Sequence, residues 1–294
     1  MDKVVVIGGS GFLGSHTADE LTRRGFKVLV FDSSRSRWIQ ENQDMMVGDV
    51  LNEEELEIAM RGARYCYHFA GIADIDESHA RPVETINLNV MGLTKSLEAA
   101  RVAKVDRFVY ASTMYVYSLF GSFYRASKQA SETIIEAYQS GYSLNYTLLR
   151  YGSLYGPRSQ AWNGLRKYVH QAVNTGSIDY LGSGNERREY IHVKDAARLS
   201  VDVLDEEHRN KAITVTGSQI MTSKELINLI FEIAGKEANV NFEETQSAGY
   251  HYTMTPYRYT PQQSEKLIPK QFIDLGQGVL ELVEELYNEK QAPI

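Results

Sequence analysis

A tyrosine and a lysine four positions apart, Tyr124 and Lys128, form the pair in this sequence best suited to acid–base chemistry. At that spacing the two side chains lie on one face of a helix, and the lysine ammonium can lower the pKa of the phenol. Thr113 lies 11 residues before the tyrosine, at the end of a strand-like run. Together the three side chains could orient a hydroxyl or carbonyl group and exchange its proton. A Tyr–Lys pair alone is more often part of an ordinary amphipathic helix. Other features of the sequence are therefore needed to identify the pair as catalytic.

A glycine-rich turn near the amino terminus supplies a second chemical signal. Gly8, Gly11 and Gly14 follow the apolar run Val4–Ile7 and open a helical pattern. In that setting the first glycine permits the turn, the second lets the backbone approach a pyrophosphate, and the third lets the helix pack closely on the strand. The helix amino terminus offers its N–H groups to the phosphates. The turn therefore predicts a dinucleotide site.

An acidic residue, Asp32, closes the second predicted strand, 18 residues after Gly14. A carboxylate there can accept both ribose hydroxyls and would repel a 2′-phosphate, which favours NAD over NADP. Arg35 and Arg37 could instead serve a 2′-phosphate, but we interpret them as an exposed basic loop. NAD is the predicted cofactor, and no metal site is predicted.

Composition narrows the class of protein. The chain has 294 residues, of which 43% are hydrophobic and 23% charged, with a net charge of −7. This suits a folded protein with a substantial core and argues against nucleic acid as a partner, which needs a basic face. The single cysteine, Cys66, is expected to be a small buried hydrophobe in a protein of a reducing compartment. With no apolar run long enough to cross a bilayer, we expect a cytoplasmic protein without a membrane partner.

Short β-branched runs alternate with helical patterns in the first half of the chain, which is typical of a parallel sheet covered on both faces. The expected strands are Lys3–Ile7, Lys27–Phe31, Met45–Val47, Ala63–Phe69, Arg107–Ser112 and Leu144–Arg150. The expected helices are Gly14–Arg24, Glu53–Met60, Val83–Val102 and Ser127–Gln139, and further along Ser223–Ala234 and Leu275–Tyr287. Ile213–Thr216 is expected to be one more strand of the sheet, and Glu243–Pro269 an irregular surface stretch.

The fold class is therefore α/β: a doubly wound Rossmann sheet with a smaller carboxy-terminal α/β domain for substrate. We expect residues 1–155 to bind NAD, with a return of the chain to this domain around 190–217. Residues 156–294 are expected mainly to bind the substrate.

From residue 3 to about residue 200 the chain resembles the extended short-chain dehydrogenases/reductases of the NAD-dependent nucleotide-sugar epimerase/dehydratase family, in particular those like UDP-glucose 4-epimerase. Besides the glycine turn and Asp32, the resemblance rests on Gly48-Asp49-Val50, His68-Phe69-Ala70-Gly71, Asn89-Val90-Met91-Gly92, Ala111-Ser112-Thr113, Tyr124-Arg125-Ala126-Ser127-Lys128, Leu149-Arg150-Tyr151-Gly152-Ser153-Leu154-Tyr155-Gly156-Pro157 and Arg187-Arg188-Glu189-Tyr190-Ile191-His192-Val193-Lys194-Asp195.

The resemblance implies roles for individual residues. Thr113, Tyr124 and Lys128 would be catalytic. The implied cofactor contacts are Gly8, Gly11, Phe12, Leu13, Gly14, Asp32, Asp49, Val50, Phe69, Ala70, Gly71, Tyr124, Lys128 and Tyr151. The implied substrate contacts are Thr113, Ser153, Arg158, Arg188, Tyr190 and Arg258, with Arg188 on the nucleotide diphosphate. Asn89 is expected to form a polar kink in its helix, and His68 and His192 to be packed, hydrogen-bonded histidines.

Two departures from the family pattern bear on the reaction. Related 4,6-dehydratases and decarboxylases carry an acid directly after the catalytic threonine, whereas Met114 and Tyr115 stand here, so loss of water or carboxylate is disfavoured. The short spacing from Thr113 to Tyr124 implies a pocket that is either more open or closed by other residues.

The resemblance favours a nucleotide-sugar 4-epimerase that works by transient hydride transfer through a 4-keto intermediate. A 4-dehydrogenase or 4-ketoreductase with net redox is the alternative; a 4,6-dehydratase and a non-catalytic dinucleotide sensor are disfavoured. The helices Val83–Val102 and Ser127–Gln139 correspond to those that pair in relatives, so a homodimer is expected.

Overall fold

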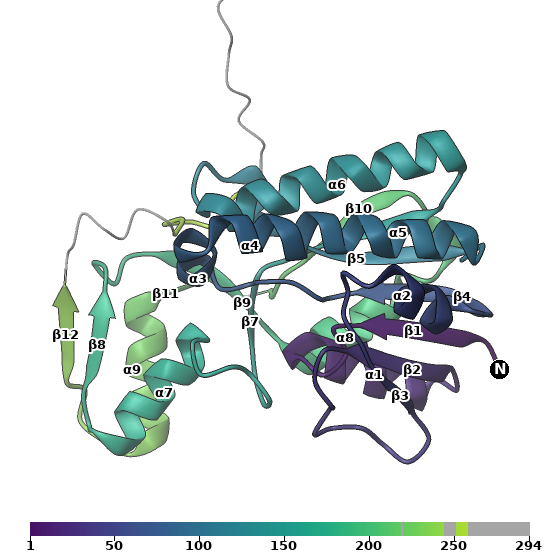
Figure 1. Cartoon of the computed structure of the whole chain (residues 1–294). Helices are drawn as coiled ribbons and strands as arrows, with labels where there is room; N and C mark the ends of the chain where they lie inside the picture. Colours follow the sequence, from purple (N-terminus) through teal and green to yellow (C-terminus); the bar gives the residue numbers. More distant parts are fainter. Residues whose placement is uncertain (219, 244–250, 258–294) are drawn as a thin grey trace, which may run out of the picture. The chain divides into compact units, whose positions relative to one another are not determined.

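The computed structural model describes residues 1–218, 220–243 and 251–257. Its main feature is a seven-stranded sheet with the strand order β10-β6-β5-β4-β1-β2-β3, in which every neighbouring pair is parallel (Figure 1). The strands are β1 (Lys3–Ile7), β2 (Lys27–Asp32), β3 (Asp44–Val47), β4 (Ala63–His68), β5 (Arg107–Thr113), β6 (Tyr146–Tyr151) and β10 (Lys211–Val215). The doubly wound parallel sheet expected from the alternating pattern is thus confirmed, and the strands begin and end within two residues of their predicted bounds.

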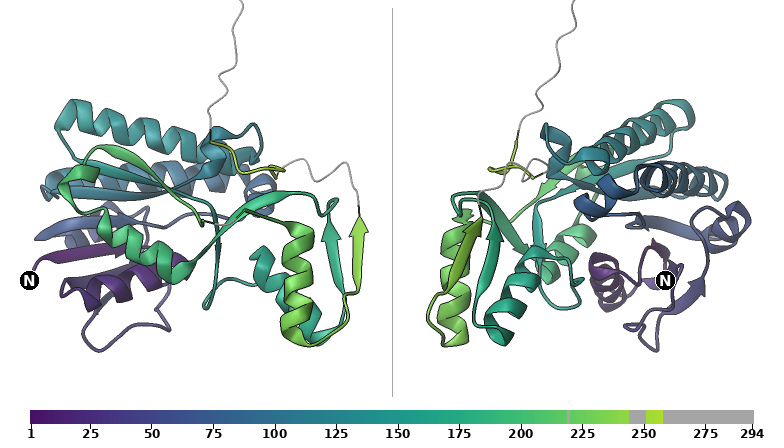
Figure 2. Two further views of the ribbon diagram at one scale, coloured as in Figure 1. Left: turned by 180° about the vertical axis from the view of Figure 1, so that it is seen from behind. Right: turned by 60° about the vertical axis from the view of Figure 1, so that its left-hand side comes forward.

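Helices cover both faces of this sheet (Figures 1 and 2). On one face lie α1 (Phe12–Arg23) and α8 (Val193–Asp202), and on the other α2 (Glu53–Met60), α5 (Gly92–Val102) and α6 (Ser122–Tyr142). Because successive side chains of a strand point to opposite faces, β1 gives Val4 and Val6 to the first core and Val5 and Ile7 to the second. Cys66 of β4 is fully buried in the second core, as expected.

The long helix expected over residues 83–102 is broken by a π-helical turn. It runs as α4 (Pro82–Ile86), a π segment (Asn87–Met91) and α5. Within that turn the Asn89 amide accepts a hydrogen bond from the Ile72 nitrogen at 2.7 Å and donates to the Ile72 oxygen at 3.0 Å and to Ser127 Oγ at 2.9 Å. The expected polar kink is confirmed, because a wider turn lets the amide reach both neighbours.

The second half of the chain returns to the sheet before it leaves again. Strand β10 pairs with β6, and Ser200 of α8 accepts a hydrogen bond from the Tyr67 hydroxyl at 2.8 Å while its own hydroxyl lies 2.6 Å from the Tyr151 hydroxyl. Arg107, only 1% exposed, reaches the Val203 oxygen beyond the end of α8 at 3.3 Å. These contacts fix the return segment to the sheet.

The remaining described elements lie outside the large sheet, and several of them share a further, smaller core. They are α3 (Ile75–Ala80), β7 (Ser153–Tyr155), α7 (Gly164–Asn174), β8 (Ile178–Leu181), β9 (Arg187–His192), β11 (Ile220–Thr222), α9 (Ser223–Ala234) and β12 (Val240–Glu243), with short 3-10 turns at Met114–Tyr117 and Glu206–His208. Apart from α3, these longer elements make a three-stranded sheet β11-β9-β7, a pair β12-β8, and a helical layer in which Ile227 and Phe231 of α9 are buried. Only α9 among them had been expected, at its observed bounds.

Two expectations about the second half meet the structure differently. Within Glu243–Pro269, expected to be irregular surface, residues 251–257 are irregular apart from one isolated bridge at Met254 and are mostly exposed; Tyr252 and Thr255 are the buried exceptions. The expected helix Leu275–Tyr287 lies outside the described residues.

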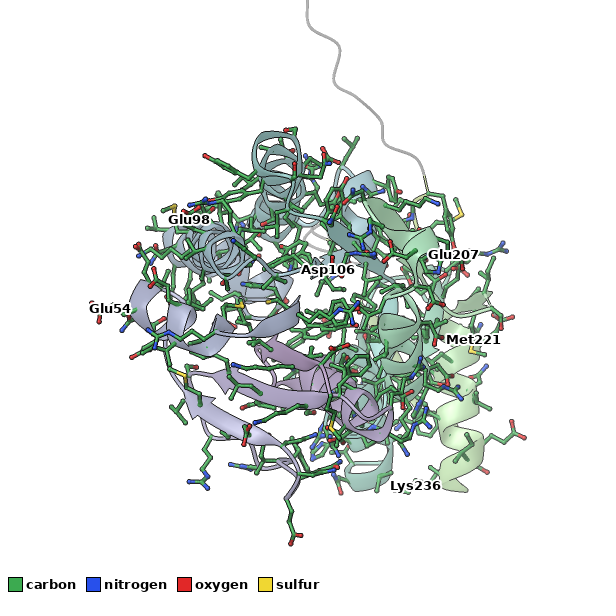
Figure 3. The ribbon with its side chains drawn as sticks, turned by 90° about the vertical axis from the view of Figure 1, so that its right-hand side faces the viewer. Glu54, Glu98, Asp106, Glu207, Met221 and Lys236 are labelled. Carbon is green, nitrogen blue, oxygen red and sulfur yellow. The ribbon has the colours of Figure 1, made fainter. Side chains whose placement is uncertain are left out.

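The exposed charges lie at the periphery of the sheet and its helices. Glu54 of α2 points outward, and Glu207 and Lys236 are exposed as well (Figure 3). No helix in the described part of the chain is both long enough and apolar enough to span a bilayer.

The glycine turn between β1 and α1 leads to a stability prediction. A Cβ on Gly14 would lie 2.2 Å from the Gly8 oxygen, so Gly14→Ala must push the helix from the strand. We expect a loss of about 1–3 kcal/mol in the free energy of unfolding, measured by urea denaturation. Gly141→Ala in α6, where a Cβ would meet nothing within 4 Å, is the control and should lose nothing. Equal stabilities of the two variants would contradict this account.

Candidate active site

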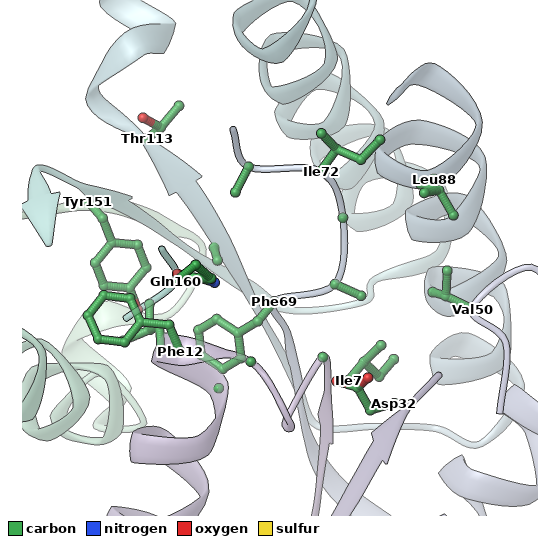
Figure 4. A pocket seen from close by; sticks show the side chains of 18 of the residues that line it. Ile7, Phe12, Asp32, Val50, Phe69, Ile72, Leu88, Thr113, Tyr151 and Gln160 are labelled. Carbon is green, nitrogen blue, oxygen red and sulfur yellow. The ribbon is translucent and has the colours of Figure 1, made fainter. Parts of the chain in front are cut away.

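A cavity of about 500 Å³ opens at the carboxyl ends of the central strands (Figure 4). Asp32 lies toward one end of it and Thr113 toward the other. The expected catalytic and cofactor residues all line it: Gly8, Gly11, Phe12, Leu13, Gly14, Asp32, Asp49, Val50, Phe69, Ala70, Gly71, Thr113, Tyr124, Lys128 and Tyr151. Parallel strands bring these segments together because their carboxyl ends meet at one edge of the sheet.

The glycine turn gives this cavity a bare backbone floor. Gly8 has a φ of +78°, and a Cβ there would lie 2.5 Å from the Ala70 nitrogen. Gly11 is the amino-terminal cap of α1 and lines the cavity, so the amino terminus of that helix lies at the cavity wall. The floor fits a pyrophosphate, which needs close approach and N–H donors.

Asp32 is held in place by backbone N–H groups of the two adjoining loops. Its carboxylate accepts from the Ser10 nitrogen at 3.0 Å and from the Ser34 nitrogen at 3.1 Å. Arg35 and Arg37 are exposed and do not line the cavity. A fixed carboxylate at this position fits the ribose of a dinucleotide that has free hydroxyls.

Tyr124 and Lys128 lie within one helix turn, as the spacing predicted, because α6 begins at Ser122 rather than at Ser127. The earlier start follows Gly121, whose φ of +104° turns the chain into the helix. The Lys128 ammonium donates to the Ala111 oxygen at 2.7 Å and lies 5.8 Å from the centre of the Tyr124 ring.

Burial controls the proton affinities of this pair. Burial lowers the pKa of Lys128 to about 8, while the nearby Glu132 carboxylate opposes that shift. Burial raises the pKa of Tyr124 to about 12, and a hydrogen bond with Thr113 opposes the rise. Desolvation thus dominates the shift of the Tyr124 pKa, and the Lys128 ammonium is bound to the Ala111 oxygen; that Lys128 lowers the Tyr124 pKa stays a prediction.

Glu132, one turn after Lys128, ties the site elements together and was not identified from the sequence. It accepts from Arg150 Nε at 3.0 Å and Nη2 at 2.6 Å, and from the Ser112 hydroxyl. Arg150 also donates to the Tyr117 hydroxyl. Arg150 pairs with Ser112 in the β5–β6 register, directly before the pair Thr113 and Tyr151. One carboxylate thus joins α6, β5 and β6.

A group of aromatic residues lies against Tyr124. Tyr115, two residues after Thr113, packs edge-on to Tyr124 with 6.1 Å between ring centres. Its hydroxyl lies 2.9 Å from His251 Nδ1, and its ring lies 4.4 Å from that of Tyr252. The short Thr113–Tyr124 spacing thus places Tyr115 and residues 251–257 beside Tyr124, and whether the pocket is more open or closed by other residues stays a prediction. Residues 251–257 carried no motif by which the sequence could have identified them.

The expected substrate residues fall into three groups. Ser153 and Tyr190 are partners in the β7–β9 register, and Arg188 lies on β9 beside them; none of the three is among the residues that line the cavity. Arg158 does not line this cavity: it pairs with Asp19 at 2.8 Å and covers the Trp38 ring, which places it on the outer side of α1. Arg258 lies outside the described residues. Cavity residues that were not identified from the sequence include Ile72, Leu88, Gln160, Trp162 and Asn163.

The two histidines expected to be packed and hydrogen-bonded differ. His192 packs edge-on to Tyr155 and accepts from the Lys194 nitrogen at 3.3 Å, as expected. His68 is fully buried between Phe108 and Tyr110, but neither ring nitrogen has a hydrogen-bond partner among the described residues. For His68 the expected packing is right and the hydrogen bond is wrong, because its neighbours on the sheet face are aromatic.

A glycine turn after the first strand of a doubly wound sheet, with Thr, Tyr and Lys facing the same cavity, defines a dinucleotide-dependent short-chain dehydrogenase/reductase of the extended type. The model of the NAD dependent epimerase/dehydratase family matches residues 4–216, and the chain belongs to this family. It is accordingly an enzyme.

Relatives within the family differ in reaction. The chain is 22% identical to a putative UDP-glucose 4-epimerase of Methanocaldococcus jannaschii over 312 aligned positions, which cover 98% of this chain and 99% of the relative. It is 25% identical to the dTDP-D-glucose 4,6-dehydratase of Mus musculus, covering 90% and 82%. Among solved structures, Thermus thermophilus UDP-glucose 4-epimerase in complex with NAD superposes with a TM-score of 0.79 at 24% identity, covering 88% of this chain and 90% of that one. The structural likeness supports the fold.

His68 leads to a prediction about pH and stability. Burial lowers its pKa to about 3, against 6.5 for a free histidine, so below pH 6.5 the unfolded chain takes up a proton that the folded chain refuses. Stability is therefore lost as the pH falls. Between pH 7 and pH 5 the wild type should lose about 2 kcal/mol more than His68→Met, measured by urea unfolding at each pH. The exposed His170 serves as control, since His170→Met should keep the wild-type loss; an equal loss in both variants would sink the argument.

Proposed function

We propose that this enzyme is an NAD-dependent nucleotide-sugar 4-epimerase. The observation that carries the proposal is the convergence of Thr113, Tyr124 and Lys128 on the cavity that begins at the glycine turn. The chemistry that NAD supplies when bound is reversible acceptance of a hydride from a sugar carbon. The turn residues, Asp32 and Lys128 would hold the dinucleotide, and Arg188 with Tyr190 and Ser153 would hold the sugar nucleotide.

In the proposed reaction the chain's own residues move one proton. The Thr113 hydroxyl orients the sugar 4-hydroxyl, and Tyr124, reacting as its phenolate, accepts the hydroxyl proton and becomes the phenol as the 4-keto sugar forms. After the sugar turns its other face, the Tyr124 phenol returns the proton. Lys128 keeps a positive charge close to the phenol ring throughout.

The residues after Thr113 support a reaction confined to one carbon. Neither Met114 nor Tyr115 has a carboxyl group that could exchange a proton beside the sugar. Met114 is also fully buried, and the Tyr115 hydroxyl is engaged by His251. This favours epimerisation over 4,6-dehydration. A 4-dehydrogenase or 4-ketoreductase would use the same three residues and differs by net production or consumption of NADH.

The finer assignments follow the same proposal. Residues 1–155 with the return around 190–217 would bind NAD, and residues 156–294 would mainly bind the sugar nucleotide.

A homodimer is supported by the exposed apolar side chains of α4 and the π turn, with Val83 82%, Ile86 38% and Met91 46% exposed. Light scattering should give twice the chain mass, and Val83→Glu should shift the measured mass toward that of the monomer.

The single buried thiol supports a reducing, cytoplasmic compartment.

Tyr124→Phe tests the catalytic assignment. UDP-glucose, UDP-N-acetylglucosamine and dTDP-glucose would be incubated with the enzyme, and the 4-epimers and NADH measured by chromatography and absorbance. We expect 4-epimers without accumulation of NADH, and a fall of about 100-fold or more in rate for Tyr124→Phe. Tyr138→Phe, on the same helix but bonded to Glu98, is the control. Unchanged activity of Tyr124→Phe would overturn the assignment, whereas accumulation of NADH would favour the dehydrogenase.

Asp32→Ala tests the choice of cofactor. Removing the fixed carboxylate takes away a ribose acceptor and the repulsion of a 2′-phosphate, so NAD should bind more weakly and NADP more tightly. Fluorescence titration of both cofactors measures the ratio of affinities. Asp44→Ala, on the exposed β3, should leave that ratio unchanged. A wild type that already prefers NADP would refute the proposed cofactor.

A further inference from the structure

Arg188 is surrounded by phenol rings rather than by carboxylates. Its guanidinium lies 5.3 Å from the centre of the Tyr252 ring, and its other electrostatic neighbours include Tyr115, Tyr190 and Tyr180. Within the described ranges no carboxylate lies at ion-pair distance from it. Other arginines of this chain are paired: Arg150 with Glu132, and Arg158 with Asp19.

This difference decides what the arginine can bind. A guanidinium that gives its N–H groups to a carboxylate must lose that partner before it can take a phosphate. An aromatic face attracts the cation by about 0.5–2 kcal/mol and occupies none of the in-plane donors. Arg188 thus has neutral phenol neighbours, including a side-chain hydrogen bond with Tyr115, and no carboxylate partner among the described residues for an anion to displace.

The carboxylate closest in sequence, Glu189, is kept on the other side of the strand. Successive side chains of β9 alternate, so Arg188 and Tyr190 share one face and Glu189 points to the other, where it is buried. The Tyr257 hydroxyl donates to that carboxylate.

Tyr252 is held in place by burial, by a ring contact and by a backbone hydrogen bond of its segment. It is 4% exposed, its ring lies 4.4 Å from that of Tyr115, and its segment is tied to β9 by the hydrogen bond from the Arg187 nitrogen to the Thr253 oxygen at 2.8 Å. Since Tyr115 also packs on Tyr124, Tyr252 is placed between the catalytic tyrosine and the arginine.

We propose that Tyr252 is a positioning residue for substrate binding: its ring holds the Arg188 guanidinium, which has no carboxylate partner among the described residues, in place to receive the diphosphate of the sugar nucleotide. This inference rests on the proposed function, in which Arg188 binds that diphosphate. It assigns a substrate-affinity role to a segment that carries none of the family motifs.

The test measures binding of UDP and dTDP to the full chain by calorimetry. Tyr252→Leu should weaken binding of the preferred nucleotide about tenfold, and raise KM by the same factor while kcat stays within about threefold of wild type. Tyr252→Phe keeps the ring and should bind as wild type does. Tyr142→Leu, at the exposed end of α6, is the matched control and should change nothing.

A double-variant comparison separates this role from simple loss of structure. In an Arg188→Leu background, Tyr252→Leu should cause no further loss of affinity, because its effect passes through the arginine. A tenfold loss in that background too, or a loss in Tyr252→Phe equal to that in Tyr252→Leu, would overturn the proposal. So would unchanged binding by Tyr252→Leu. If the wild type binds neither nucleotide, the proposed function fails and this inference falls with it.

Discussion

The buried ion pair between Glu132 and Arg150 is the interaction on which the geometry of the site depends. Glu132 lies on the helix that carries Tyr124 and Lys128, and Arg150 lies beside the strand end that carries Thr113. Removing one partner of such a pair leaves an unpaired buried charge, which costs about 3–5 kcal/mol in comparable proteins. The pair therefore fixes the position of α6 relative to the ends of β5 and β6. It thereby also fixes the distance between Thr113 and Tyr124.

Much of the sheet could be predicted from sequence because its rules are local. A run such as Val4–Ile7 that ends in glycine can only be a buried strand leading into a turn, and parallel strands then gather their carboxyl ends at one edge. By these rules the glycine turn is a dinucleotide site, and Asp32 and Thr113 each lie where a strand ends. The resemblance supplied the rest of the cavity, including Asp49 and Phe69, which pattern alone would not have singled out.

What escaped prediction depends on contacts between distant segments. Arg158 carries the same charge in the sequence as Arg188, but only the fold shows that the first meets Asp19 and the second meets tyrosines. Tyr252 lies more than 130 residues from Tyr115, in a stretch with no periodicity to interpret. His68 was expected to find a hydrogen bond at a strand end, and its aromatic neighbours on the sheet face leave it without one. Pairing of side chains across such separations is decided by packing, which single-sequence patterns do not encode.

The lone thiol has a practical consequence. Cys66 is the single cysteine of the chain and is fully buried on β4, between β1 and β5, where burial also raises its pKa well above that of a free thiol. A thiol reagent cannot reach Cys66 unless the centre of the sheet opens. The rate of alkylation should therefore measure how often the sheet opens around β4. A ligand that binds only the folded sheet should lower the alkylation rate of Cys66 in proportion to its occupancy. That rate would therefore report ligand binding without any added label.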